Sequence, residues 1–342
     1  MNSTLLIIAG AYAGYKCIKE FVVVPKYVKA NLKKYNNSDK VKILELPDSV
    51  YEPVDEELAK QNPVYDQAFE TFGMKIESII PREDLNNYYR NFATLKESET
   101  DRKHFLRHLL RGELVGGSYD PQKNSVALKT TRLSKYMGSV NHELLHASTT
   151  YYDKENKVIY CGFEQMFIKY ENEKKGESYA MGINEGYTQY LNIKLFGNEV
   201  IGQKAYAEQQ VIAKALEFVV GEEKMRSMYF RADSNGLFKE LEKYVSRDEL
   251  YKFINVTDIL CVMGRFANRK MPEIAEAQLF VNNFILKLIV KAKGINPSNL
   301  SYETFEMLKE YIPYPKTEGI TINLSSEEKT KEENEEVGMG GR

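Results

Sequence analysis

Histidine is scarce in this chain of 342 residues, and the spacing of its four histidines is the feature that most restricts the fold. They form two pairs, His104 with His108 and His142 with His146, and the members of each pair are four residues apart. Side chains four apart lie on the same face of an α-helix, with their Cβ atoms about 5–6 Å from each other. Each pair therefore predicts two imidazoles on one helix face.

Residues 142–146 read His-Glu-Leu-Leu-His, and this segment predicts a metal site. Two imidazoles at this spacing can reach one zinc ion at about 2.0–2.1 Å, and Glu143 stands beside the first of them. From composition alone, about 0.007 matches to His-acid-x-x-His are expected, so chance is a poor explanation. The sequence thus predicts a metal-binding helix from about residue 133 to residue 149.

The alternative is a pair of ordinary histidines on an amphipathic helix, and the apolar pattern weighs against it. At about 100° per residue, His142 and His146 fall on the side of the helix opposite its apolar stripe. They are therefore expected to face a cleft or solvent, not the core that the leucines enter. The stripe consists of Leu133, Tyr136, Met137, Val140, Leu144 and Ala147.

The pair His104 and His108 has the same spacing but no acidic residue between its members. Positive charge around it opposes the binding of a cation, so this pair predicts a solvated helix face. The basic neighbours are Arg102, Lys103, Arg107 and Arg111.

A catalytic zinc site needs a third protein ligand, and Glu185 is the strongest candidate. It lies in residues 182–189, which read Gly-Ile-Asn-Glu-Gly-Tyr-Thr-Gln and open a predicted helix. Together with the His-Glu-Leu-Leu-His segment, this phrase resembles the gluzincin metallopeptidases, in which a glutamate follows a His-Glu-x-x-His helix as third ligand. It is similar to the thermolysin-like Gly-x-x-Asn-Glu-x-x-Ser-Asp, and Ala147 and Tyr151 also match that group. The resemblance extends from Ser125 to Asn192.

The resemblance implies a zinc-dependent metallopeptidase that hydrolyses a peptide or protein substrate. By it, His142, His146 and Glu185 are the zinc ligands and Glu143 is the general base. Thr188 and Gln189 fall where the family has residues that support the ligands. Gln189 replaces the aspartate that would hold a ligating histidine, and its carbonyl can accept the imidazole N–H without carrying charge. We therefore expect weaker metal affinity, by about 10–100-fold.

Two further features depart from the family pattern. The 38 residues between His146 and Glu185 are about twice the thermolysin-like length, which indicates an insertion or a different gluzincin lineage. No histidine follows His146, so the distal histidine that assists the thermolysin-like transition state has no counterpart. The candidates to replace it are Tyr187, Tyr229 and Arg231.

The fold class expected is mainly α (α+β): a zincin-like catalytic core with a small β-sheet or hairpin and an active-site helix, followed by a C-terminal helical region. Helical periodicity extends over residues 63–115, and strands are expected at 125–129, 158–161 and 165–170, with a turn at 151–156. In the resembling family, extended substrate pairs with the edge of a sheet, and the strand at 125–129 is compatible with that role and equally with a plain structural role. Later helices are expected at 182–196, 206–220, 222–230, 236–245, 247–263, 272–293 and 302–312.

The chain divides into five predicted segments. A hydrophobic and basic segment at 1–34 precedes an N-terminal helical region at 35–120, a zincin-like core at 121–200 and a C-terminal helical domain at 201–314. A Glu-rich and Lys-rich tail at 315–342 cannot bury enough apolar surface to fold and is expected to be disordered.

The hydrophobic and basic segment at 1–34 is compatible with more than one cellular location of the protein. Residues 4–24 reach the length of a membrane span only if their charged residues are tolerated, so a membrane anchor and a buried or surface helix are both compatible with it. A secretory signal fits less well because no Lys or Arg precedes the apolar stretch. We expect a cytoplasmic protein, with membrane association through residues 4–24 as an open alternative.

The charge balance excludes one class of partner. With 47 Lys and Arg against 49 Asp and Glu the net charge is −2, which argues against nucleic acid as a partner. A catalytically silent zinc-binding protein, with a regulatory or membrane-associated interaction role, remains the alternative to a peptidase. Structural zinc sites are usually closed by four protein ligands, often cysteines, and only Cys161 lies near these motifs in sequence.

Overall fold

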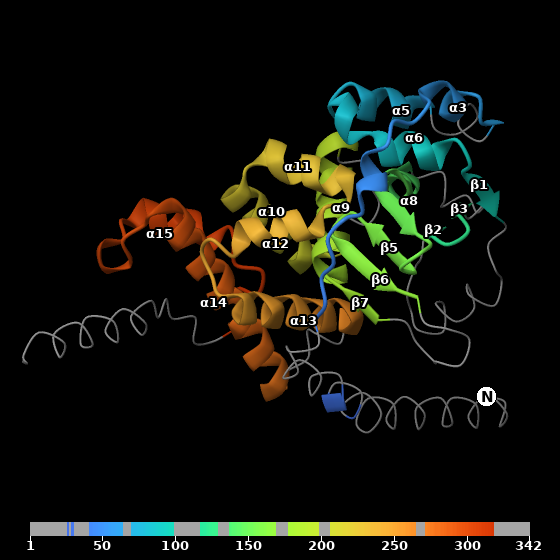
Figure 1. Ribbon diagram of the computed structural model, residues 1–342. Coiled ribbons are helices and arrows are strands. Elements are labelled where there is room, and N and C mark those ends of the chain that lie inside the picture. The colour runs from blue at the N-terminus through green and yellow to red at the C-terminus, as the bar shows by residue number, and fades with distance from the viewer. Residues whose placement is uncertain are drawn as a thin grey trace, which may run out of the picture.

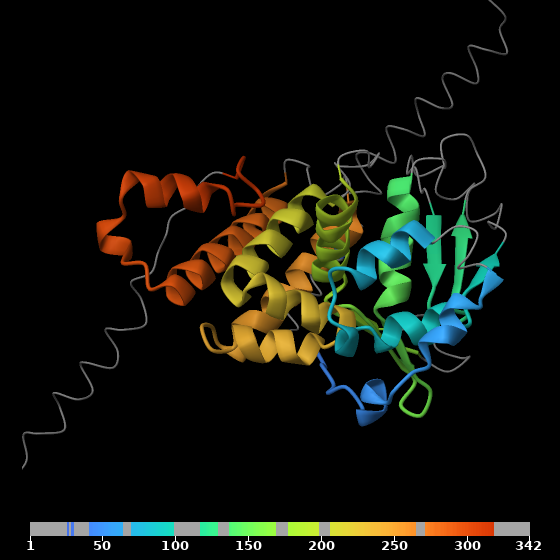
Figure 2. The same ribbon diagram turned by 90° about the horizontal axis from the view of Figure 1, so that it is seen from above.

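The computed structural model shows a mainly α fold with two small β-sheets, as the sequence predicts (Figures 1 and 2). Most of the N-terminal segment, the pair His104 and His108, and most of the predicted tail lie outside the described residues. The structure describes residues 26, 29 and 30 and the ranges 41–63, 70–98, 117–128, 137–168, 177–197, 206–264 and 271–317.

The first sheet has the strand order β1-β3-β2, with β1 at Lys96–Ser98, β2 at Gly117–Asp120 and β3 at Ser125–Leu128. β3 is parallel to β1 and antiparallel to β2, so it is paired on both sides. Of the two roles that the sequence left open for this strand, the pairing on both sides favours the plain structural strand over one that pairs with substrate at a free edge. β1 also interrupts the helix predicted over 63–115, because its Lys-Glu-Ser sequence carries no strand signal of its own and depends on pairing with β3.

The second sheet is an antiparallel meander with the order β4-β5-β6-β7. Its strands are β4 at Thr150–Asp153, β5 at Val158–Cys161, β6 at Glu164–Phe167 and β7 at Glu177–Tyr179. β4 corrects the turn expected at 151–156, where only the last residues turn. Asp153 ends the strand, and its side chain accepts hydrogen bonds from the backbone of Glu155 and Asn156.

The described helices surround these sheets. In Figures 1 and 2, α3, α5 and α6 lie on the same side of the molecule as the sheets, and α10 to α15 lie on the other side. The bounds are α3 Glu56–Lys60, α5 Glu70–Glu77, α6 Asn86–Phe92, α8 Met137–Ser148, α9 Met181–Phe196, α10 Ala207–Val220, α11 Glu222–Arg231, α12 Ser234–Leu241, α13 Arg247–Met263, α14 Pro272–Lys293 and α15 Tyr302–Lys309. Short 3₁₀ turns occur at Asp48–Tyr51, Arg82–Asp84 and Pro297–Asn299.

Several helices begin or end at residues that typically start or stop a helix. Pro272 begins α14, and Gly294 ends it in the left-handed conformation that glycine adopts readily. Ser246 and Ser301 accept backbone hydrogen bonds at the starts of α13 and α15. Among the described residues, none of the helices combines the length and the apolar character needed to cross a bilayer, and residues 4–24 lie outside that set.

Helix α9 is central to the hydrophobic core, because it packs against α8, α10 and α13. Two of its glycines allow these approaches. A Cβ atom at Gly182 would lie 2.7 Å from the carbonyl oxygen of Thr257 in α13, and one at Gly186 would overlap the carbonyl of Gln209 in α10. The Gly-Ile-Asn-Glu-Gly phrase thus serves close packing on both sides of Glu185.

Replacing Gly186 by alanine tests this packing. A glycine in an open helix interior gains about 1 kcal/mol of stability on becoming alanine. At Gly186 we expect the opposite sign, a loss of about 1–3 kcal/mol in the free energy of unfolding, because the added methyl group must displace backbone. Urea denaturation of Gly186→Ala measures the change, and a stabilised variant would contradict the close approach.

Candidate metal centre

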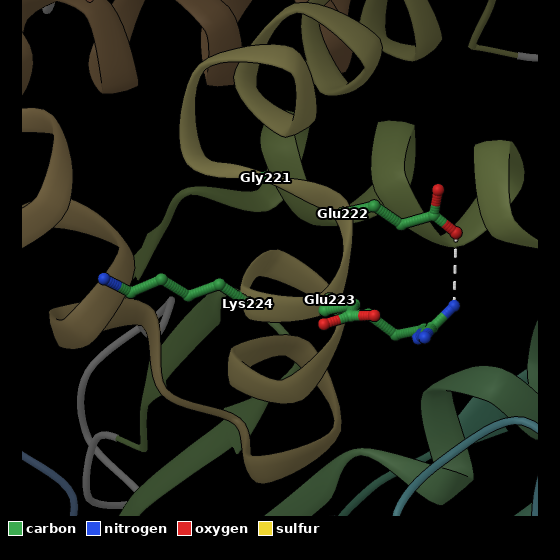
Figure 3. A pocket seen from close by; sticks show the side chains of 5 residues that line it. Gly221, Glu222, Glu223 and Lys224 are labelled. Atoms are coloured by element: carbon green, nitrogen blue, oxygen red, sulfur yellow. Dashed lines mark hydrogen bonds and ion pairs between the residues drawn. The ribbon is translucent and has the colours of Figure 1, made fainter.

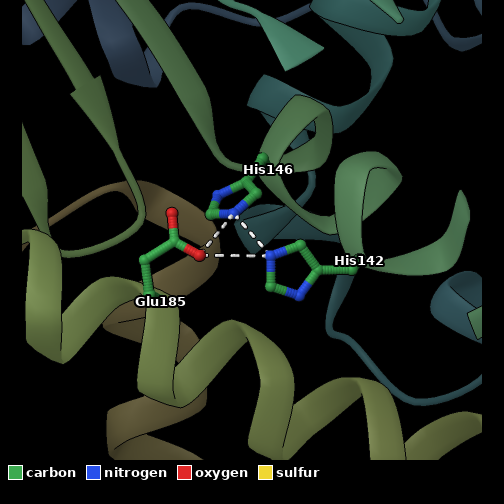
Figure 4. A group of neighbouring side chains, drawn as sticks. All are labelled: His142, His146 and Glu185. Carbon is green, nitrogen blue, oxygen red and sulfur yellow. Dashed lines mark hydrogen bonds and ion pairs between the residues drawn. The ribbon is translucent and has the colours of Figure 1, made fainter. Parts of the chain in front are cut away.

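Two neighbouring helices bring three donor side chains together. His142 and His146 extend from α8 and Glu185 from α9, and all three side chains point toward one another (Figure 4). The Oε2 atom of Glu185 lies 3.2 Å from Nε2 of His142 and 3.7 Å from Nε2 of His146. The two Nε2 atoms are 3.1 Å apart. One ligand atom from each residue therefore lies within 4.8 Å of the others.

These separations fit a single tetrahedral metal ion. Donors at about 2.0–2.1 Å from a tetrahedral ion lie about 3.3 Å from one another. The three measured distances, 3.1, 3.2 and 3.7 Å, bracket that value. Two imidazole nitrogens and one carboxylate oxygen are also a donor set that metal ions accept. The residues present therefore fit a bound metal ion without a change of fold.

Each imidazole contacts a side chain other than a carboxylate through its Nδ1 atom. The Oε1 atom of Gln189 lies 3.0 Å from Nδ1 of His142, and the Sγ atom of Cys161 lies 3.5 Å from Nδ1 of His146. Nδ1 thus faces the protein and Nε2 faces the proposed metal position in both rings. The histidines are only 8% and 7% exposed, because α9 covers the helix face that the sequence assigned to a cleft or solvent.

The local charges favour an ionised glutamate. Burial alone would raise the pKa of Glu185, but the charge of His146 and hydrogen bonds from both histidines hold that pKa well below its usual range. Burial opposes a charged His146, and the Glu185 carboxylate and then Cys161 outweigh it, so the pKa of His146 is raised. Without a metal ion, a proton on His146 therefore balances the charge of the Glu185 carboxylate. A bound cation would balance the same charge.

Glu143 lies on the same helix beside the two histidines and has a different environment. Burial raises the pKa of its carboxyl, and the charges of His142 and His146 partly offset this. The carboxylate also accepts a hydrogen bond from the backbone N–H of Tyr119 in β2. A carboxyl with a raised pKa, close to a cation site, is suited to accept and return a proton.

Contacts from other elements fix α9, and with it Glu185. The carboxylate of Asp258 in α13 accepts hydrogen bonds from the backbone N–H groups of Ala180 and Gly182, at 2.8 and 2.7 Å, and so caps the N-terminus of α9. Asn184 is fully buried, and its Oδ1 atom accepts from the backbone of Phe163 at the β5–β6 turn, at 3.1 Å. Neither partner is adjacent in sequence.

Tyr206 also lies at the site, although no motif in the sequence points to it. Its ring stacks on that of His142, with centroids 6.0 Å apart and an interplanar angle of 10°. The charge of Glu185, then burial, and a hydrogen bond to Glu185 raise the pKa of its hydroxyl. The residue precedes α10 in a left-handed conformation, with φ at 55°, and it belongs to no motif. Only the packing of α10 on α9 brings it to the histidines.

The three residues that the sequence offers for the transition state each bond to another side chain. The hydroxyl of Tyr187 is bonded to Glu217, 3.0 Å away, and Arg231 pairs with Asp84. Tyr229 donates to or accepts from Thr188, with 2.6 Å between the oxygens, and both side chains are fully buried. Thr188 also donates to the backbone of Asn184 at 2.8 Å. These three candidates therefore have structural partners of their own.

A separate pocket of about 580 Å³ opens where α10 meets α11 (Figure 3). Glu222 and Arg226 form an ion pair of 3.2 Å at its edge. Two acidic and two basic side chains line it, and neither histidine nor Glu185 contributes to it. The pocket is lined by Gly221, Glu222, Glu223, Lys224 and Arg226.

Comparison with known protein families, with curated proteins and with solved structures gives no match for this chain. The likeness to the gluzincins therefore consists of the short motifs and of the geometry of His142, His146 and Glu185 described above.

Glu164, in β6, provides a pH test of the surroundings of the site. Burial raises the pKa of its carboxyl to about 7, although Ser178 donates a hydrogen bond to it. Because the folded state holds this proton more tightly than the unfolded state, stability should fall as pH rises from about 4.5 to about 7. The variant Glu164→Gln cannot ionise and so lacks this loss of stability. Between about pH 4 and pH 8 we therefore expect its free energy of unfolding to rise by about 3 kcal/mol relative to that of the wild type.

Denaturation of the metal-free proteins at several pH values measures the effect. The matched control is Glu155→Gln, which removes the same group from the exposed turn after β4. A stability difference between Glu164→Gln and wild type that does not change with pH would contradict the raised pKa.

Proposed function

We propose that this chain is a zinc-dependent metallopeptidase. The observation that carries the proposal is the convergence of His142, His146 and Glu185, with both Nε2 atoms turned toward one position. Zinc is proposed because two imidazoles and one carboxylate are the ligands of catalytic zinc in peptidases, where a fourth position stays open. The substrate is proposed to be a peptide or protein.

Glu143 is proposed as the general base. Zinc bound at this position would lower the pKa of a water molecule toward about 7 and polarise the substrate carbonyl. The Glu143 carboxylate would take the proton from the attacking water and pass it to the leaving amine. Burial raises its pKa, which helps it to hold that proton between the two steps, and Tyr119 keeps the carboxylate oriented through its backbone N–H.

Tyr206 replaces the three earlier candidates for the transition state. Its hydroxyl lies against Glu185, and its ring packs on His142. A phenol there can donate a hydrogen bond to the oxyanion that develops on the carbonyl. The raised pKa keeps this hydroxyl protonated throughout the neutral range, as a donor must be.

The strand proposed to align the substrate is β2, not β3. Within the described residues β2 pairs with β3 on one side alone. Its other side carries the N–H group of Tyr119 that reaches Glu143, so that side faces the reaction position. An extended peptide pairing with β2 would place its scissile bond beside the general base.

A closed structural site is less well supported. Such a site needs a fourth protein ligand, and the described residues supply three within metal-binding distance. Cys161 contacts His146 through Nδ1, on the side of the ring away from Glu185. A silent zinc protein would also leave Glu143 without a role.

The variant Glu143→Gln tests the base. We expect its kcat for peptide cleavage to fall by about 10²–10⁴-fold, because the amide cannot accept the proton. Its zinc content, measured by atomic emission, should remain at about one ion per chain. The matched variant Glu185→Ala should lose both zinc and activity. Full activity of Glu143→Gln would remove the proposed base, and unchanged zinc in Glu185→Ala would place the third ligand elsewhere.

Tyr206→Phe tests the donor to the oxyanion. It keeps the ring that stacks on His142 and removes the hydroxyl, so we expect kcat to fall by about 10²–10³-fold. The KM and the zinc content should change little. Tyr190→Phe is the control, since that hydroxyl bonds to Glu217, 2.9 Å away. An unchanged kcat in Tyr206→Phe would exclude this role.

A further inference from the structure

We propose that Cys161 is a positioning residue of the metal centre. In this inference, which rests on the proposed function, its sulfur accepts a hydrogen bond from Nδ1–H of His146. That contact sets the angle of the ring and leaves Nε2 free to bind metal.

The geometry places Cys161 behind His146. The Sγ atom is 3.5 Å from Nδ1, while Nε2 of the same ring lies 3.1 Å from Nε2 of His142 and 3.7 Å from Oε2 of Glu185. The sulfur and the other two ligands therefore contact opposite nitrogens of one imidazole. Cys161 is thereby placed to orient a ligand, and it is not placed to be one.

The remaining contacts of the thiol decide which atom carries the proton. The S–H group can donate to the backbone oxygen of His146, 3.7 Å away. The Nδ2 atom of Asn184 donates to the sulfur at 4.0 Å. With its own hydrogen directed to that backbone oxygen, the sulfur offers lone pairs to Nδ1–H, so His146 has its proton on Nδ1.

The fold holds the sulfur firmly in this position. Cys161 is 3% exposed and is the last residue of β5, where it pairs with Thr150 of β4. β4 begins directly after α8, so the strand pair returns beneath the last turn of the helix that carries His146. Thr149 adds a side-chain contact to the sulfur at 3.9 Å.

The same arrangement explains the length of the segment before Glu185. Cys161 lies among the 38 residues between His146 and Glu185, which exceed the thermolysin-like length. The hairpin formed there supplies the group behind His146, while Gln189 supplies the group behind His142. Neither group is a carboxylate, so neither imidazole gains the basicity that a carboxylate partner would give it.

The experiment compares Cys161→Ala with Cys161→Ser, which remove the same sulfur but differ in whether an acceptor remains. We expect Cys161→Ala to weaken zinc binding by about 10–100-fold and Cys161→Ser to recover most of the loss. Competition with a chromophoric chelator measures the affinities. Cys261→Ala is the control, since this cysteine in α13 shows no hydrogen bond to either histidine among the described contacts.

A second readout does not need zinc. In metal-free protein with ¹⁵N-labelled histidine, the Nδ1–H proton of His146 should be observed and protected from exchange, and Cys161→Ala should expose it. A merely structural role would affect alanine and serine alike and leave this proton unchanged.

The outcomes separate the two claims. Wild-type protein that binds no zinc but shows the protected Nδ1–H would overturn the proposed function and support the positioning role. Folded Cys161→Ala with wild-type zinc affinity, or a wild-type His146 with no Nδ1–H, would overturn the positioning role alone.

Discussion

The close packing of α9 on α8 is the constraint on which the site depends. Glu185 reaches the two histidines only because the helix backbones approach closely, and Gly186 permits the neighbouring contact with α10. Asp258 and Asn184 then fix the helix along its axis through hydrogen bonds to distant backbone groups. Contacts within the fold thus hold the helix that carries Glu185, and a donor held in place lowers the cost of binding an ion.

The electrostatic arrangement follows from this burial. A buried, ionised carboxylate is stable only when a cation or a proton lies beside it. The pKa of Glu185 is lowered and that of His146 is raised for this reason, because each charge stabilises the other. Glu143 differs because burial dominates its environment, which raises its pKa. Carboxyls with opposite shifts in one site are suited to different roles, here those of the proposed ligand and the proposed base.

Features that depend on local spacing could be predicted from the sequence. The interval between His142 and His146 and the bounds of α13 and α14 follow from helical periodicity and end signals. Tyr206 and Cys161 could not be found in this way, because each reaches the histidines through packing between distant elements. The strands β1, β2, β4 and β7 were missed for a similar reason, since partner strands stabilise short segments that carry weak local signals.

X-ray absorption at the zinc edge identifies the atoms around the ion whatever the substrate is. For zinc-loaded protein we predict nitrogen and oxygen donors alone, at about 2.0–2.2 Å, with the scattering pattern of two imidazoles. A sulfur donor at about 2.3 Å, or the signature of a single imidazole, would contradict a centre built from His142, His146 and Glu185.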